Sequence, residues 1–136
     1  MLEGIRTLHS RHSVDETLSR LESMLAEKKI KLFTIVDHSG EANAIGLHMP
    51  TTKLILFGNP AAGTPLMISA PSLALDLPLK MLLSQEPNGS TEISWNDPAY
   101  LQSRHGFAES LVPKLAVVES LARALADQDA PTSINA

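Results

Sequence analysis

Several polar residues stand at turns between apolar segments, where side chains could converge on a ligand. The first is Asn59, in the sequence Gly58-Asn59-Pro60. A strand that runs into the N-terminus of a helix points free backbone N–H groups at one spot, which suits a phosphate or a carboxylate. The same residues also suit an ordinary helix start, because Asn is a favoured cap and Pro is favoured at the first helical position. An anion site and a plain cap therefore both stay open at this corner.

Asp76 and Lys80 form a second candidate pair, on either side of Leu77-Pro78-Leu79. An Asp and a Lys that converge on a cleft could bind a polar ligand or shift each other's pKa. The structural alternative is an Asp that fixes the turn before Pro78 and a Lys that points to solvent. Lys80 is the more unusual residue of the two, because it lies on an otherwise apolar strand.

His48 is the third candidate, beside Met49 and before Pro50. Histidine can act as acid, base or metal ligand near neutral pH, and a His-Met pair is compatible with copper. No second group of ligands stands at a usable spacing in the sequence, so we expect a hydrogen-bonded loop histidine. His9 and His12 lie on a predicted strand and face opposite sides, so they cannot chelate together. The predicted ligand-binding set is Asn59, Asp76, Lys80 and His48, with no metal and no cofactor.

Catalytic patterns are weaker still. Arg104 and His105 end a helix that starts at Asp97, where they could bind an anion or simply favour the helix dipole. The composition allows a Ser–His–Asp triad, but the sequence contains no Gly-x-Ser-x-Gly nucleophile elbow. Glu86 and Glu92 flank a hairpin and are expected to be solvated. Whether the chain is an enzyme stays open at this level.

The composition of the 136-residue chain suits one domain, because 43% of the residues are hydrophobic. The net charge of −4 argues against nucleic-acid binding, which needs an excess of Lys and Arg. The absence of cysteine excludes thiol catalysis, disulfides and cysteine-based metal sites, and it fits a cytoplasmic location. No apolar stretch is long enough for a signal peptide or a membrane span, so we expect no membrane contact.

The elements that must position the candidates follow from hydrophobic periodicity and turn residues. A capping box, Ser13-Val14-Asp15-Glu16, predicts a helix start. Asn88-Gly89 predicts a hairpin with a type I′ turn, and the strand after it should bury Trp95. Strands are expected over 5–12, 30–38, 53–57, 79–85 and 90–95, and helices from residue 13 and over 41–47, 61–70, 97–105 and 110–126.

These elements predict an α+β fold, a two-layer sandwich with a mixed or antiparallel sheet and helices mainly on one face. One domain should span residues 1–126, followed by a frayed tail over 127–136. The strands at 32–36 and 54–57 are apolar on both faces and are expected in the middle of the sheet. Helices cover one face only, so a second copy of the chain is the simplest cover for the other, and we expect a homodimer.

Four segments give the chain a family resemblance. They are Phe57-Gly58-Asn59-Pro60, Gly63-Thr64-Pro65-Leu66-Met67, the run from Ala74 to Lys80, and Asn88-Gly89 with the strand of Trp95. Their order and spacing over about residues 5–125 resemble the bacterial and archaeal family called domain of unknown function 302. The resemblance implies a small two-layer α/β fold and dimers. It implies no accepted activity, so it assigns no catalytic residue.

The sequence therefore leaves the function unknown and favours one hypothesis. We expect a homodimeric module that binds a small polar or anionic molecule near the Gly58-Asn59-Pro60 and Asp76–Lys80 turns. The alternatives are a structural or protein-interaction domain without a ligand site, and an enzyme of unidentified reaction.

Overall fold

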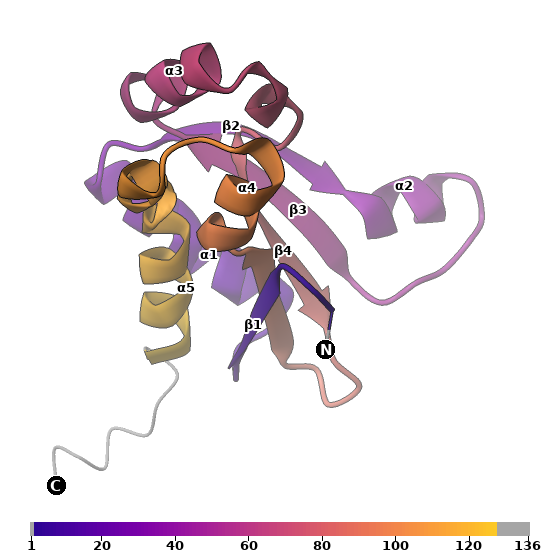
Figure 1. Cartoon of the computed structure of the whole chain (residues 1–136). Coiled ribbons are helices and arrows are strands. Elements are labelled where there is room, and N and C mark those ends of the chain that lie inside the picture. The colour runs from indigo at the N-terminus through magenta and orange to yellow at the C-terminus, as the bar shows by residue number, and fades with distance from the viewer. Residues whose placement is uncertain (1, 128–136) are drawn as a thin grey trace, which may run out of the picture.

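The fold is built on one five-stranded antiparallel sheet whose strands lie in the order β1-β5-β4-β3-β2 (Figure 1). A computed structural model describes residues 2–127 of the chain. The strands are β1 (Ile5–Ser10), β2 (Lys31–Asp37), β3 (Thr52–Gly58), β4 (Leu79–Gln85) and β5 (Thr91–Asn96). The helices are α1 (Val14–Glu27), α2 (His38–Ala44), α3 (Pro60–Ser69), α4 (Pro98–His105) and α5 (Val117–Asp127), with 3-10 helices η1 (Pro71–Leu75) and η2 (Glu109–Leu115).

The core lies between one face of the sheet and the helices. Burial alternates along β4 and β5, as expected for strands with one covered face. The helices α1 and α5 contact each other and pack on this face, which confirms the predicted α+β sandwich. Burial of each large apolar side chain stabilises the fold by about 1.5–3 kcal/mol before conformational entropy is subtracted. The buried residues include Leu21, Leu25, Ile55, Phe57, Met81, Leu83, Ile93, Trp95, Leu121 and Leu125.

Local capping residues act as the sequence predicts. The Ser13 side chain accepts a hydrogen bond from the Glu16 N–H at 3.1 Å and starts α1. The Asp97 side chain accepts from the Ala99 N–H at 3.1 Å and starts α4. Gly106 ends α4 with φ of 76°, a left-handed conformation that glycine adopts without steric cost.

Two helices differ from the prediction. The helix expected over 41–47 begins earlier, at His38, because the Asp37 side chain accepts from the Gly40 N–H at 2.9 Å and caps it. This hydrogen bond, together with one from Ser39, lowers the pKa of Asp37. The helix expected over 110–126 is divided into η2 and α5. Pro113 lies inside η2 and has no N–H to donate, which disfavours a continuous α-helix there.

The hairpin between β4 and β5 also differs in its turn type. A type I′ turn needs positive φ at both central residues. Here the Gly89 N–H donates to the Glu86 carbonyl at 2.8 Å, so Pro87 and Asn88 are the central residues, and only Gly89 has positive φ. The predicted turn needs positive φ at Asn88 as well as at Gly89, and Asn88 does not have it.

The two strands expected in the middle of the sheet have different positions. β3 lies between β4 and β2, whereas β2 is an edge strand, so the expectation is wrong for β2. Leu32 and Phe33 on β2 are 37% and 43% exposed. The tail predicted over 127–136 falls outside the described residues from 128 onward. Within the described part, no helix is long and apolar enough to cross a membrane.

Candidate functional site

A cavity of about 490 Å³ opens beside the Gly58-Asn59-Pro60 corner. It lies where the end of β3, the first turns of α3 and the turn before β4 meet η2 and the start of α5. Most of its wall is apolar and is formed by Ile30, Phe33, Met67, Leu77, Leu79, Leu115 and Val117. Asn59, Thr64 and Lys114 are polar residues of the lining. The size and the mixture of apolar wall and few polar groups are typical of small-molecule sites.

Local sequence explains why the cavity forms there. Pro60 and Asn59 start α3 at the end of β3, so the chain turns sharply away from the sheet. At Gly63 a Cβ atom would lie 3.4 Å from Leu77 Cδ1, so the glycine lets α3 approach the turn before β4 closely. The helix therefore forms one wall without filling the space beneath it.

The free N–H groups expected at this corner are occupied. The Asn59 side-chain oxygen accepts from the Ala61 N–H at 2.9 Å. The Asn59 carbonyl accepts from the N–H groups of Ala62 and Gly63 at 2.9 and 3.0 Å. Asn59 is thus a helix cap, which is the structural alternative that its sequence context left open. Its side-chain amide nitrogen forms no hydrogen bond with the described residues, and it remains available at the cavity.

Asp76 and Lys80 do lie together, but both bind protein groups. Lys80 Nζ donates to the carbonyl oxygens of Asp76 and Pro78 at 3.0 and 3.1 Å. Burial lowers the pKa of Lys80, and the neighbouring Asp76 charge opposes this shift. Asp76 Oδ2 in turn contacts Arg104 Nη1 at 3.0 Å and His105 Nε2. The four residues connect the turn before β4 with the end of α4.

This network contains the three residue types of a hydrolase triad. Ser72 Oγ lies 2.7 Å from His105 Nδ1, and the His105 side chain is 3% exposed. The order is reversed relative to serine proteases, in which the serine meets Nε2 and the carboxylate meets Nδ1. Ser72 and His105 line neither of the two cavities described here. We therefore interpret the Ser72–His105–Asp76 chain as a connection between η1 and α4.

His48 lies apart from the other predicted site residues. It lines a second cavity of about 360 Å³ together with Asp15, Asp37 and Lys53. Lys53 Nζ and Asp15 Oδ1 form an ion pair there at 3.0 Å. Residue 48 precedes β3 and residue 59 follows it, and a seven-residue strand spans about 20 Å. The four predicted residues therefore do not converge on one site.

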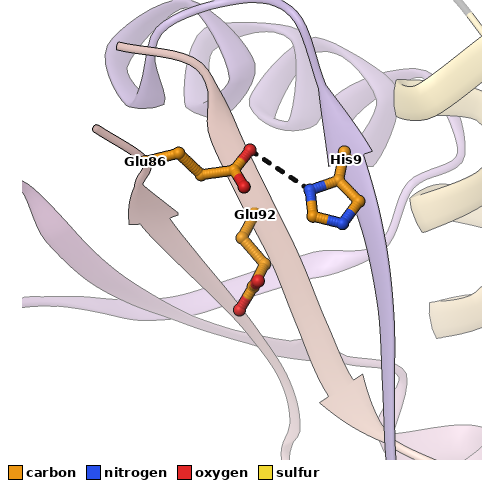
Figure 2. Close-up of side chains that lie close together, drawn as sticks. All are labelled: His9, Glu86 and Glu92. Carbon is orange, nitrogen blue, oxygen red and sulfur yellow. Dashed lines mark hydrogen bonds and ion pairs between the residues drawn. The ribbon is translucent and has the colours of Figure 1, made fainter. Parts of the chain in front are cut away.

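Sequence reasoning missed two features of the molecule. Lys114 reaches the first cavity only because Pro113 divides the C-terminal helix and η2 folds back against α3. His9, Glu86 and Glu92 come together on the open face of the sheet, where Figure 2 shows their side chains close together. No local pattern predicts either arrangement, because both depend on contacts between distant segments.

The fold and the first cavity define a small α+β module with space for one ligand. The chain matches the family model described as domain of unknown function DUF302 over residues 6–127, and it belongs to this family. The crystal structure of an uncharacterized conserved DUF302 protein from Bacillus stearothermophilus is similar in fold. Its TM-score is 0.76 at 21% identity, covering 95% of this chain and 100% of that one.

The chain is also similar to part of several ion-channel proteins from Brucella. The chain is 41% identical over 107 residues to the fluoride-specific ion channel FluC 1 of Brucella suis biovar 1 (strain 1330), covering 79% of this chain and 42% of the channel protein. It has the same identity to FluC 2 of Brucella melitensis biotype 1, of which it covers 40%. The chain thus spans about two fifths of the curated relatives that it matches.

Proposed function

We propose that this chain is a binding module for a small, largely apolar molecule that carries an anionic group. The observation that supports the proposal is the apolar cavity of about 490 Å³ with Lys114 among its lining residues. The sequence analysis also placed a site at the Gly58-Asn59-Pro60 corner, but it expected a small polar or anionic molecule. The ligand proposed here is largely apolar and carries one anionic group. A mostly apolar wall favours an apolar body over a fully polar molecule, because burial of apolar surface drives binding.

The anionic group is assigned to the rim of the cavity. Lys114 is exposed and forms no ion pair or hydrogen bond with the residues that the structure describes. The side-chain amide nitrogen of Asn59 can donate a further hydrogen bond. The backbone N–H groups at the start of α3 are already used by Asn59, so they contribute little beyond the helix dipole.

The test compares two fluorescent probes of similar shape. 1-Anilinonaphthalene-8-sulfonate carries an anionic group, and N-phenyl-1-naphthylamine lacks it. We expect both to bind the whole chain. Lys114→Ala should weaken binding of the sulfonate about tenfold and leave the neutral probe nearly unchanged, because a charge-assisted hydrogen bond contributes about 1.5–3 kcal/mol. Ala62→Phe, which places a ring at the cavity wall, should weaken both probes.

Lys28→Ala is the matched control, since Lys28 is an exposed lysine at the end of α1 that is not among the residues lining the cavity. It should leave both affinities unchanged. Absence of binding by either probe, or equal affinities in the wild type and Ala62→Phe, would contradict the cavity as the site.

We also propose that the module is a homodimer. Supporting it are Val36, Leu54, Leu56 and Leu82, which point away from the core on β2, β3 and β4 and are only half-buried. A second copy on this face would remove their apolar surface from water. A cytoplasmic, bacterial setting is part of the same proposal. The lack of cysteine and the relatives from Brucella and Bacillus support it.

A second candidate function is favoured by the relatives. The Brucella proteins that carry a similar segment are fluoride-specific ion channels, and most of their length lies outside the match. We propose that this chain associates with a channel component of that kind as an accessory module. The ligand cavity and this association are compatible, because a module of this kind can bind a small molecule and a partner at different surfaces.

A further inference from the structure

We propose that His9, Glu86 and Glu92 bind a divalent transition-metal ion such as Zn²⁺ on the open face of the sheet. The three side chains lie at the far end of β4 from the apolar cavity, since Leu79 at the start of β4 lines that cavity and Glu86 follows the end of β4. This inference does not depend on the proposed ligand site.

The sheet brings the three residues together. His9 on β1 and Glu92 on β5 are directly opposite each other in the antiparallel register. Glu86 follows β4, which is paired with the other edge of β5. Figure 2 shows the Glu86 carboxylate turned toward the His9 ring, whereas the Glu92 carboxylate points away from both. One ligand atom from each residue lies within 4.8 Å of the others, and His9 Nδ1 is 3.1 Å from Glu86 Oε1.

The donor set suits a transition metal. One imidazole nitrogen and two carboxylates resemble the sets of three protein ligands that hold Zn²⁺ at sites with an open position. Zinc bonds of about 2.0–2.2 Å place neighbouring ligand atoms about 3.4 Å apart in a tetrahedron. The distance between His9 Nδ1 and Glu86 Oε1 is already close to this separation. Rotation of the half-buried Glu92 side chain can bring its carboxylate to the same distance from the other two ligands.

Charge and local support point the same way. Hydrogen bonds from His9 and then Ser90 lower the pKa of Glu86. Ser90 Oγ donates to Glu86 Oε1 at 2.9 Å and orients it, as outer hydrogen bonds do for metal ligands.

The proposal departs from the expectation that the chain has no metal site. Residues 9 and 86 are 77 positions apart, so no ligand spacing is visible in the sequence. Cross-strand pairing makes them neighbours. The His9 side chain is 60% exposed and that of Glu86 is 27% exposed, so an ion can enter from solvent. The fourth position around the ion would be open to water or to a small anion.

The experiment is calorimetric titration of the whole chain with ZnCl₂ after treatment with a chelator and dialysis. We expect one Zn²⁺ per chain. His9→Ala and Glu92→Gln should each weaken binding at least about tenfold, because each removes one of three ligands. Glu92→Gln preserves the side-chain volume, and circular dichroism checks that both variants are folded. NMR of the histidine rings should show the largest Zn²⁺-dependent shift at the nitrogens of His9.

His48→Ala is the matched control, because His48 lies in the second cavity near Asp15 and Asp37. It should bind Zn²⁺ as the wild type does. No binding at millimolar Zn²⁺ would overturn the proposal. So would wild-type affinity in folded His9→Ala and Glu92→Gln, and so would a ring shift confined to His48.

Discussion

Asp76 shows how one carboxylate can hold distant residues together. Its Oδ2 atom contacts Arg104 and His105, and its carbonyl accepts a hydrogen bond from Lys80. Arg104 and His105 differ in burial. The Arg104 side chain is 50% exposed, whereas the His105 side chain is 3% exposed. The buried contact should therefore matter more for stability than the exposed ion pair.

Asp76→Ala is predicted to reduce the free energy of unfolding by about 2–3 kcal/mol, because it leaves the buried His105 ring without its acceptor. Arg104→Ala should cost less than about 1 kcal/mol, as is usual for an exposed ion pair. Urea unfolding of both variants measures the difference. Asp15→Ala, in the exposed pair with Lys53, is the control. A loss for Asp76→Ala no larger than that for Asp15→Ala would contradict the prediction.

At the scale of elements, the sheet presents two different halves on its open face. Thr7, His9, Glu92 and Ser94 make the face polar over β1 and β5, where Thr7 and Ser94 are hydrogen-bonded at 3.3 Å. Over β2, β3 and β4 the same face carries the apolar side chains of Val36, Leu54, Leu56 and Leu82, with polar residues such as Thr52 and Lys80 beside them. A dimer that covers the apolar half leaves the proposed metal site open to solvent, so the two proposals do not compete for the same strands.

Sedimentation equilibrium at micromolar concentration tests the dimer. We expect a species of twice the chain mass of 14.7 kDa. Leu54→Glu should shift it to monomer, because Leu54 lies between Val36 and Leu82, and an unpaired carboxylate buried among apolar side chains is costly. The control is Leu75→Glu, since Leu75 on η1 is 75% exposed and lies outside the face. A wild-type chain that sediments only as monomer would remove the dimer proposal.

At the scale of the whole molecule, the match to part of the Brucella channels raises the question of a partner. In those relatives the similar segment and the rest of the protein belong to one chain. Tethering gives an effective concentration of about millimolar, so a weak interface is sufficient within one chain. A module of this family that is not tethered to a channel part would need to associate with it through its own surface.

The prediction is that the unmatched part of the Brucella suis protein, purified in detergent with an affinity tag, retains this chain. The expected dissociation constant is about 1 mM or tighter, because an interface of that strength is half occupied at the effective concentration above. Surface plasmon resonance measures it, with a soluble protein of similar size and charge as the control. Equal signals from the chain and the control at millimolar concentration would argue against association.

Local patterns alone determined most of the elements. The caps at Ser13, Asn59 and Asp97 and the alternation in β4 and β5 are properties of neighbouring residues, so they are readable along the chain. The family resemblance, which the family model confirms, rests on short segments of the same kind. The predicted starts of α2 and α5 were wrong because Asp37 caps an earlier helix start and Pro113 interrupts the C-terminal helix. The predicted turn type was wrong because Asn88 does not adopt positive φ.

Tertiary structure alone decided where the chemistry lies. Strand order made β2 an edge strand and placed His9 opposite Glu92. The tertiary structure also placed Asn59 and Lys114 at a cavity whose wall is mostly apolar. The physical reason is that hydrophobic periodicity tells which face of a strand is buried, whereas pairing between distant strands depends on the packing of the whole core.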